Sequence, residues 1–485
     1  MKTKEENKNA AGRRDFIKSS AIAAAAFMIV PRHVLGGKGF LAPSDRLLIA
    51  GIGAGGKGQS DISMFAKSSK ADIAFLCDVD ERSAAKSVKA FPKAKFYKDW
   101  REMLDKESKN FDAVSVSTPD HNHAIITLAA MQLGKHVYVQ KPMTHDIHEA
   151  RILTQATKKY KVVTQMGNQG ASNDGPRLMK EWYEAGLIGD VHTVYAWTNR
   201  PIWPQGIAWP TAKAEIPKEL DWDLWLGTAP KKDYADKIVP FNWRGWWDYG
   251  TGALGDMGCH LIEAPFSVLN LQYAKDVQCS VGAVYVDKSK RGYFPDSCPP
   301  SSHVTLTFPK TNKTKGDVTL HWMDGGIQPE RPEELGATEL FGDGGNGTLF
   351  IGTKGKMMAD TYGDKARLLP LSRNENIKVA PKYARVTDGA NGHYAQWVEA
   401  AIAGHGKQEV SSPFEIAGPL TEALLMANLA IRGFDLQTDV NGKIKYPGRY
   451  IKLLWDNENM KITNLDQINQ FVKRDYREGW ANLTL

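Results

Sequence analysis

Short apolar runs alternate with longer segments of helical periodicity in the first third of the chain. The runs typical of buried strands are residues 47–50, 73–76, 113–117, 136–139 and 162–164. Helical periodicity is found at residues 124–133 and 147–160. Alternating strands and helices predict a doubly wound parallel sheet of the α/β class, in which ligands bind at the carboxyl ends of the strands.

The pattern changes after about residue 270. Strand-like runs at 279–285, 304–308 and 318–322 are followed by glycine-rich turns around residues 342–347 and at Gly352 and Gly355. These runs predict a large, open, mostly antiparallel sheet. Helices are expected around residues 393–403 and 415–432, packed back across both domains. We therefore expect a doubly wound domain over residues 44–167 and an α+β domain over residues 168–485.

The first forty residues have the pattern of an export signal. Arg13-Arg14 precede Phe16-Ile17-Lys18 and then an apolar stretch, residues 21–30, that is too short to span a bilayer. The paired arginines resemble the signal read by the twin-arginine export machinery, which carries folded proteins. Residues 1–40 are therefore predicted to send the protein to the periplasm, tethered to the membrane if the leader stays uncleaved. A disordered basic tail is the alternative.

Charge and cysteine content exclude some classes of protein. The net charge of +7 comes from 62 basic and 55 acidic residues, and part of the excess lies in the first forty residues. A basic stripe with interleaved aromatic residues is missing, so no nucleic-acid partner is expected. The four cysteines have no C-x-x-C spacing. Cys279 and Cys298 could pair only in an oxidising compartment.

A glycine-rich loop follows the first strand and opens a helical segment. It reads Gly51-Ile52-Gly53-Ala54-Gly55-Gly56 and has the G-x-G-x-x-G form of a dinucleotide-binding Rossmann domain. Gly51 would permit the tight turn, Gly53 the approach of the pyrophosphate, and Gly56 the close packing of helix and strand. Asp78 ends the second strand, where a carboxylate binds the ribose hydroxyls, so the motif predicts NAD; NADP stays possible because Arg82 is near in sequence.

Four motifs together resemble the glucose-fructose oxidoreductase, inositol dehydrogenase and rhizopine-catabolism family, Gfo/Idh/MocA. They are the Gly51 loop with Asp78, residues 117–124 (STPDHNHA), Gln140-Lys141-Pro142, and residues 255–260 (GDMGCH). Their order and separations match the family from residue 46 to about 270. The resemblance implies a nicotinamide-dependent oxidoreductase, cofactor contacts from Thr118 and Pro119, and a homo-oligomer formed through the outer face of the second sheet.

The resemblance also implies the catalytic groups Lys141, Asp256 and His260. In this chain Gln140 stands where the family commonly has glutamate. Asp256 and His260 are four residues apart in a segment, 255–269, that has the pattern of a helix start, so their side chains are expected on one face. We expect His260 to accept the hydroxyl proton, Lys141 to polarise the reacting oxygen, and Asp256 to bind a substrate hydroxyl or steady the histidine.

Each of these residues has an ordinary structural explanation when taken singly. Asp256 could be a helix N-cap, His260 a hydrogen-bonded core histidine, and Lys141 a solvated loop residue. Their joint occurrence after a dinucleotide-binding motif favours the catalytic interpretation. His121 and His123 with Asp120 suggest a metal site, but no further ligand spacing completes it, so no metal is expected.

Aromatic residues gather ahead of Asp256. Nine of the fourteen tryptophans lie between Trp182 and Trp247. Indole faces suit the C–H faces of a sugar ring, although core packing explains most single tryptophans. The preferred substrate-binding candidates in this region are Trp243 and Arg244, followed by Trp246 and Trp247. Asn168 and Gln169 at the rim of the sheet and Asp256 are further substrate-binding candidates.

These observations predict an exported NAD(P)-dependent oxidoreductase that acts on a secondary alcohol of a sugar or polyol. One alternative is a redox-neutral, NAD-dependent enzyme that cleaves glycosides by transient oxidation and elimination. The family includes both kinds, and scarcity of free NAD outside the cytoplasm makes a retained cofactor attractive. A non-catalytic carbohydrate-binding protein is the second alternative.

Overall fold

The computed structural model describes residues 45–212 and 214–485. The chain divides into two compact units, residues 1–46 and 47–485, and every element below belongs to the second. The expected twin-arginine signal over residues 1–40 lies outside the described residues.

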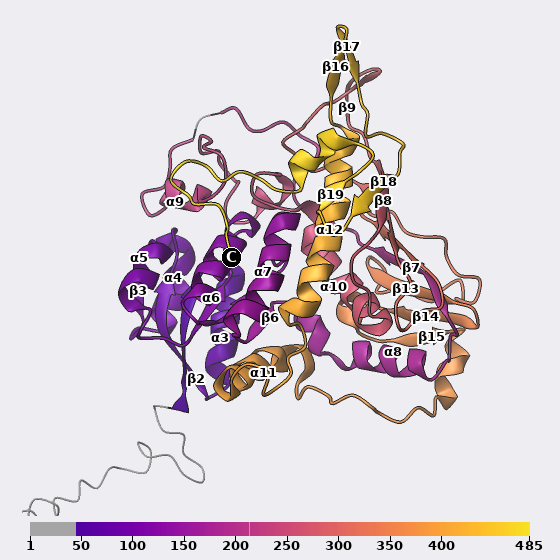
Figure 1. Ribbon diagram of the computed structural model, residues 1–485, viewed down its shortest axis with the longest axis horizontal. Coiled ribbons are helices and arrows are strands. Elements are labelled where there is room, and N and C mark those ends of the chain that lie inside the picture. Colours follow the sequence, from indigo (N-terminus) through magenta and orange to yellow (C-terminus); the bar gives the residue numbers. More distant parts are fainter. Residues whose placement is uncertain (1–44, 213) are drawn as a thin grey trace, which may run out of the picture. The chain divides into compact units, whose positions relative to one another are not determined.

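The N-terminal part of the larger unit, indigo to purple in Figure 1, is built on a six-stranded parallel sheet in the order β3-β2-β1-β4-β5-β6. Its strands are β1 (Leu47–Ile52), β2 (Ala71–Cys77), β3 (Lys95–Tyr97), β4 (Ala113–Val116), β5 (His136–Val139) and β6 (Thr164–Met166). The helices that join them are α3 (Gly56–Lys67), α4 (Glu81–Ala90), α5 (Trp100–Glu107), α6 (His123–Gln132) and α7 (Ile147–Tyr160). The predicted doubly wound parallel sheet is confirmed.

The last strand of this sheet differs from the sequence-based expectation. β6 occupies residues 164–166 rather than 162–164. Its central residue is Gln165, which is polar and fully buried. Its side-chain amide donates to the His393 carbonyl and accepts from the Ser411 backbone N–H, and these bonds compensate for the lost hydration. Apolar periodicity does not reveal a strand whose central residue is polar, so it points to the preceding valines instead.

The second sheet is mixed and mostly antiparallel, as expected. Its nine strands run in the order β15-β14-β13-β7-β12-β11-β8-β18-β19, and only the pair β7–β12 is parallel. They are β7 (Val191–Trp197), β8 (Asp276–Val281), β11 (Ser302–Phe308), β12 (Val318–Met323), β13 (Gly347–Gly352), β14 (Gly355–Ala359), β15 (Arg367–Leu369), β18 (Leu453–Asp456) and β19 (Lys461–Ile462). The remaining helices are α8 (Asp174–Glu184), α9 (Trp222–Leu226), α10 (Gly252–Leu269), α11 (Gly389–Ala403) and α12 (Phe414–Phe434).

The strand expected over residues 279–285 is two separate strands. β8 ends at Val281, and the chain then turns into a small hairpin of β9 (Tyr285–Asp287) and β10 (Lys290–Arg291). Gly282 follows the last residue of β8, and its backbone N–H still bonds the Ser301 carbonyl opposite it before the chain turns away.

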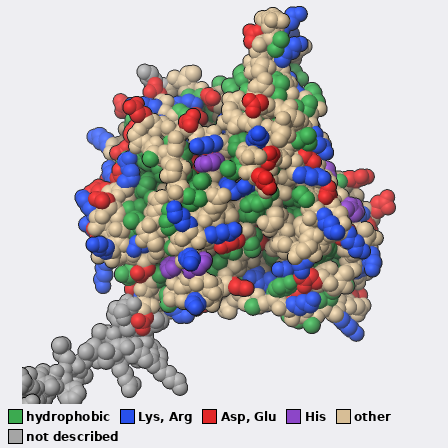
Figure 2. All heavy atoms as spheres, in the orientation of Figure 1, with side chains coloured by type: hydrophobic (Ala, Val, Ile, Leu, Met, Phe, Trp, Pro, Cys, Tyr) green, Lys and Arg blue, Asp and Glu red, His purple; other side chains and the backbone are tan. Residues whose placement is uncertain are grey.

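A second hairpin, β16 (Thr438–Val440) with β17 (Lys443–Lys445), projects beyond the end of α12 (Figure 1). All three residues of β17 are exposed, Lys443 and Lys445 among them, and Figure 2 shows basic side chains at the tip of the projection. Charged ends of this kind keep a short, solvated hairpin from pairing with other strands. On the rest of the face drawn in Figure 2, basic and acidic side chains are interspersed.

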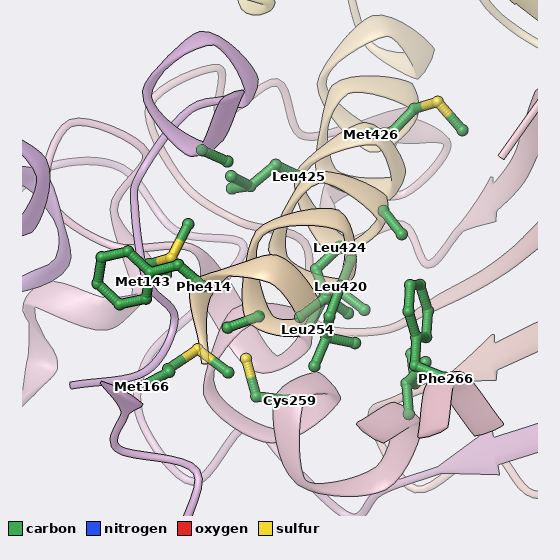
Figure 3. Packing of buried hydrophobic residues seen from close by; sticks show 14 of the residues in the cluster. Met143, Met166, Leu254, Cys259, Phe266, Phe414, Leu420, Leu424, Leu425 and Met426 are labelled. Carbon is green, nitrogen blue, oxygen red and sulfur yellow. The ribbon is translucent and has the colours of Figure 1, made fainter. Parts of the chain in front are cut away.

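Helices α10 and α12 form the layer that joins the two sheets. α12 packs on α7, α10 and β8. Its length and composition would also suit a membrane span, but 89% of its most apolar stretch is buried inside the protein. Leu420 and Leu424 of α12 lie against Leu254 of α10 (Figure 3). A Cβ on Gly258 would lie 2.5 Å from Leu424, so the glycine permits this close approach of the helices. Each buried leucine contributes about 1.5–3 kcal/mol to stability.

Candidate active site

A cleft of about 460 Å³ runs along the carboxyl ends of β1, β2, β4 and β5 and reaches α10. Among the expected site residues, those that line it are Gly53, Gly56, Asp78, Thr118, Pro119, Lys141, Gln169, Trp243, Arg244, Asp256 and His260. Parallel strands present their carboxyl ends at one edge of the sheet, which explains why residues so distant in sequence meet there. Gly51 and Asn168 lie outside the cleft wall.

The glycine loop is shaped for a close ligand. Gly53 has φ +80°, and a Cβ there would lie 2.5 Å from the Ser117 carbonyl group. The first turn of α3 has neither an acidic residue nor a side-chain cap, which leaves its backbone N–H groups to a phosphate. The Thr118 hydroxyl is buried with no hydrogen-bond partner among the described residues. These features fit the pyrophosphate of a dinucleotide.

Two of the glycine roles expected from the motif are wrong. Gly56 has φ +52°, and a Cβ there would meet no atom within 4 Å, so it provides backbone freedom and not close packing. The close contact belongs to Gly58, where a Cβ would lie 1.7 Å from the Gly53 carbonyl oxygen. At Gly51 a Cβ would lie 2.6 Å from the Ile62 side chain of α3, so this glycine makes room for the isoleucine. The tight turn of the backbone occurs at Gly53 instead. The motif identifies the correct loop but misassigns its individual contacts.

Asp78 stands at the end of β2 with its carboxylate held by two backbone N–H groups, those of Gly55 and Asp80, each at 2.9 Å. Burial raises the pKa of Asp78 to about 6, with these hydrogen bonds opposing the shift. Arg82 is bound by Asp80 at 2.7 Å and does not line the cleft. The cleft therefore offers a carboxylate without a competing arginine at this position, which suits the free ribose diol of NAD.

The catalytic lysine candidate forms an ion pair in the cleft. Lys141 follows β5, and its Nζ donates to Asp256 at both the backbone carbonyl (2.6 Å) and Oδ1 (2.9 Å). Arg244 Nε lies 3.5 Å from the same carboxylate oxygen. Burial disfavours the charged carboxylate, but Lys141 and Arg244 outweigh it and hold the pKa of Asp256 below its ordinary value. Asp256 is therefore an anion that fixes the ammonium group.

The hydrogen bonds of His260 define its tautomer. The Asn168 amide nitrogen donates to the Cys259 carbonyl at 2.9 Å, so its oxygen faces His260 Nδ1 at 2.8 Å. Nδ1 must then carry the proton, which leaves a lone pair on Nε2. Burial and the nearby Lys141 charge hold the pKa of His260 well below its ordinary value. The side chain is a neutral imidazole suited to accept a proton.

This arrangement corrects two expectations from the sequence. The partner that orients His260 is Asn168 and not Asp256, whose carboxylate faces Lys141 and Arg244 instead. Asn168 is fully buried, so it positions the histidine and cannot contact a substrate directly. Gln169 does line the cleft, and its amide oxygen has no partner among the described residues.

A buried carboxylate that the sequence did not reveal lies beneath the cleft. Asp61 of α3 accepts hydrogen bonds from Ser117 Oγ (3.0 Å), Gln140 Nε2 (2.8 Å) and Tyr394 OH (3.0 Å), and also pairs with the Lys57 ammonium. An amide at position 140 can donate to this carboxylate, whereas a second carboxylate could not. Neither helical periodicity nor any motif distinguishes Asp61 from a surface residue, because its partners come from distant segments.

Tyr362 is a second functional candidate that the sequence did not indicate. Its ring lies edge-on to His260, with 4.6 Å between the ring centroids, and it lines the cleft. The residue has φ +64°, a left-handed conformation that is uncommon outside glycine and asparagine. No local signal in the sequence marks this position, which follows β14 by only a few residues.

The aromatic candidates divide between two regions. The Arg244 guanidinium lies over Trp243, 4.3 Å from the ring centroid, and both line the cleft. Trp246 packs against Trp209 in the same buried cluster as Trp243 but does not line the cleft, and Trp247 belongs to another cluster. Chain proximity to Asp256 does not place Trp246 and Trp247 at the site, because the two successive side chains are buried in different cores.

The histidines of the 117–124 motif are structural. His121 lies between the carbonyls of Tyr249 (3.2 Å) and Trp225 (3.0 Å), and burial lowers its pKa to about 3. His123 lies between the carbonyls of Pro142 (2.8 Å) and Thr118 (2.7 Å). Neutral His121 has one N–H, which donates to the Tyr249 carbonyl, while its Nε2 accepts from the Asn122 amide at 3.1 Å. Both histidines thus tie the loops around the cleft together.

Two family models match consecutive segments of the chain. Residues 47–168 match the Gfo/Idh/MocA oxidoreductase family with its NAD-binding Rossmann fold, and residues 188–308 match the family's C-terminal alpha/beta domain. The chain belongs to the Gfo/Idh/MocA oxidoreductase family. The NAD-binding domain of this family is therefore the one that carries the glycine loop, Asp78 and Lys141.

Curated relatives match over part of their length. Levoglucosan dehydrogenase of Pseudarthrobacter phenanthrenivorans is 25% identical over 189 residues, 39% of this chain and 40% of the relative. A glycosyl hydrolase family 109 protein of Shewanella pealeana is 24% identical over 203 residues, 37% of this chain and 44% of the relative. Myo-inositol 2-dehydrogenase of Thermotoga maritima is 27% identical over 129 residues, which are 27% of this chain and 38% of the relative. The chain thus matches about two fifths of each of these relatives.

Solved structures of similar proteins share the fold. Levoglucosan dehydrogenase in complex with NADH and levoglucosan superposes with a TM-score of 0.52 at 16% identity, over 82% of this chain and 100% of that chain. The WlbA dehydrogenase of Bordetella pertussis, in complex with NADH and UDP-GlcNAcA, has a TM-score of 0.52 at 16% identity. The match covers 79% of this chain and 95% of that chain. Both comparisons extend across the two domains.

Proposed function

We propose that the protein is an NAD-dependent oxidoreductase that transfers a hydride between a secondary alcohol of a sugar or polyol and the cofactor. The observation that carries this proposal is the ion pair of Lys141 with Asp256 beside a neutral His260, in the same cleft as the glycine loop. The relatives named for levoglucosan and inositol support a sugar or polyol as the substrate class.

The side chains divide the chemistry between them. NAD supplies the hydride acceptor when it is bound. His260 Nε2 accepts the proton of the substrate hydroxyl, while the Nδ1–H bond to Asn168 keeps the ring in the required tautomer. Lys141 donates to the same substrate oxygen and stabilises the negative charge that develops on it. Asp256 fixes the ammonium group, and Arg244 is placed to bind a neighbouring hydroxyl.

Redox-neutral cleavage of a glycoside is the second candidate. The family 109 glycosyl hydrolase of Shewanella pealeana favours it, as does an alpha-N-acetylgalactosaminidase of Shewanella oneidensis that is 25% identical over 184 residues, 35% of this chain and 39% of the relative. This reaction would use the same lysine and histidine, and it would return the hydride to the substrate, so no NADH would accumulate.

One experiment separates these functions. The purified protein is first analysed for a co-purified dinucleotide, then incubated with sugars and polyols while NADH absorbance is followed, and with aryl glycosides with and without added NAD. We expect NADH to form with at least one sugar or polyol, and H260A to abolish it while NAD binding persists. Aglycone release without net NADH would select the second candidate. Dinucleotide binding without turnover of any substrate would contradict both and favour a carbohydrate-binding protein.

We also propose that the protein is exported by the twin-arginine route and forms a homo-oligomer. Export rests on Arg13-Arg14 and the apolar stretch that follows them. Cell fractionation of the wild type and of an R13K/R14K variant tests it, since the substituted signal should retain the protein in the cytoplasm. Light scattering of the purified protein measures its oligomeric state.

A further inference from the structure

A second cavity, of about 270 Å³, lies at the far end of α12. Its walls come from five separate parts of the chain: Gly206, Trp247, the loops between residues 281 and 300, the last turns of α12, and the chain around Phe471. It shares no lining residue with the cleft. Any ligand of this cavity is therefore separate from the dinucleotide and from the proposed substrate.

A guanidinium group without an acidic partner faces this cavity. Arg432 is stacked on Phe471, 4.1 Å from the ring centroid, and lies 5.6 Å from the Trp247 centroid. Among the described residues, no carboxylate forms an ion pair or hydrogen bond with it. The other arginine in the wall, Arg291, lies 3.2 Å from Asp435. Arg291 thus has a carboxylate partner in the cavity, and Arg432 has none among the described residues.

The acidic residues nearest to Arg432 are already engaged. Asp248 pairs with Lys232 at 3.1 Å. Asp146 caps α7 and lies 3.7 Å from Arg474. Asp435, besides Arg291, also binds Arg449, at 2.6 Å. No rotation of a nearby free carboxylate is available to neutralise Arg432.

The buried position of this cation costs it hydration. Burial lowers the pKa of Arg432 to about 10, and the distant Asp248 opposes the shift only in part. Aromatic faces compensate some of the lost hydration, because a guanidinium stacks well on indole and phenyl rings. An anion that enters the cavity would gain a strong hydrogen-bonded partner in surroundings of low polarity.

We propose that this cavity binds a small monocarboxylate with an apolar body, held by Arg432. A guanidinium presents two parallel N–H donors that match a carboxylate. The aromatic rings that flank Arg432 disfavour a strongly hydrated phosphate dianion, whereas a monocarboxylate can place its apolar body against them. Polar and apolar groups share the rest of the wall, and the Phe471 and Trp247 rings beside Arg432 suit a ring or short chain as the body of the ligand. The apolar and aromatic members of the wall are Trp247, Val281, Val284, Tyr293, Phe294, Pro295, Pro299, Pro300, Ile431, Leu436 and Phe471.

Calorimetric titration of the full-length protein tests this site, with benzoate and hexanoate as probes. Benzamide is the neutral analogue of benzoate, and inorganic phosphate is the competing anion. We expect saturable binding of the carboxylates, and little or none of benzamide and phosphate. R432Q should weaken benzoate binding by about tenfold or more, because a charge-assisted hydrogen bond is lost. R432K keeps the charge but loses the two parallel N–H donors, so its affinity for benzoate should lie between those of R432Q and the wild type.

R449Q is the matched control. It removes an arginine of the same neighbourhood that does not line the cavity, and it leaves Asp435 paired with Arg291. We expect R449Q to bind benzoate as the wild type does. NAD binding and thermal unfolding, measured for every variant, show whether each one is folded. The proposal is overturned if no carboxylate binds at millimolar concentration, if benzamide or phosphate binds as well as benzoate, or if folded R432Q retains wild-type affinity.

Discussion

The ammonium group of Lys141 lies 2.9 Å from the carboxylate of Asp256, although 115 residues separate them along the chain. One residue follows a strand of the first sheet, and the other belongs to the helix that joins the two sheets. The ion pair therefore assembles only when both domains are folded and packed. It also sets the charge of the candidate active site, since the anion holds the lysine in place without being able to donate a proton itself.

Removal of the Lys141 ammonium should impair turnover more than cofactor binding. We expect K141M to lower kcat by about a hundredfold or more, because a group that stabilises charge on the reacting oxygen is lost. NADH binding, followed by fluorescence, should change little. K158M, at an exposed lysine of α7, is the control and should behave as the wild type. Equal kcat for K141M and wild type would remove Lys141 from the proposed mechanism.

The tautomer of His260 depends on Asn168. We expect N168A to lower kcat by about tenfold, because the ring is no longer held with Nε2 free, while NADH affinity stays near that of the wild type. A fall in NADH affinity with unchanged kcat would instead point to a purely structural role for Asn168.

The pH profile reports the depressed pKa of His260. Protonation removes the lone pair that accepts the substrate proton, so activity is lost as the pH falls through this pKa. Since burial and Lys141 hold the pKa of His260 well below its ordinary value of about 6.5, we expect the wild type to keep full activity at pH 6.5 and to lose it only under more acidic conditions. An acid limb centred at or above pH 6.5 would contradict this assignment.

Discrimination against NADP should depend on the ionisation of Asp78. Its carboxyl has a pKa of about 6, so it is charged at pH 8, where it repels a 2′-phosphate, and largely neutral at pH 5. We expect the ratio of NAD to NADP affinity to be at least about tenfold smaller for D78N than for the wild type at pH 8. The 2′-phosphate itself titrates in the same range, with a pKa of about 6. The affinity ratios of the wild type and D78N are therefore compared at both pH values, so that the contribution of Asp78 is separated from that of the phosphate.

Glutamate at position 140 should destabilise this protein. Gln140 donates to Asp61 at 2.8 Å, and a glutamate there would bring two buried carboxylates together. We expect Q140E to lower the free energy of unfolding by about 1–3 kcal/mol at pH 8. The loss should shrink at pH 5, where one of the carboxylates can hold a proton. Urea denaturation measures both values, and the double variant D61N/Q140E should recover most of the stability.

Local sequence patterns predicted much of the first domain. The apolar runs and the glycine loop have fixed local geometry, so β5 and α7 were predicted with their observed bounds. The predicted position of β6 was two residues too early, because the hydrogen-bond partners of its buried polar residue, Gln165, lie on α11 and on the segment before α12. Gly56 was given the wrong contact because motif spacing identifies the loop but not which Cβ would collide with its neighbours.

The sequence by itself determined the parallel sheet and the dinucleotide loop, because short-range spacing and apolar periodicity are properties of neighbouring residues. Lys141, Asp256 and His260 became candidates through the resemblance of their motifs to the Gfo/Idh/MocA family. Tertiary structure alone decided the partners of these residues: Asn168 for His260, Lys141 for Asp256, and Asp61 for Gln140. It also placed Arg432 at a cavity where no carboxylate of the described residues pairs with it. Hydrogen bonds and ion pairs act over a few ångströms, so they depend on which distant segments the packed core brings together.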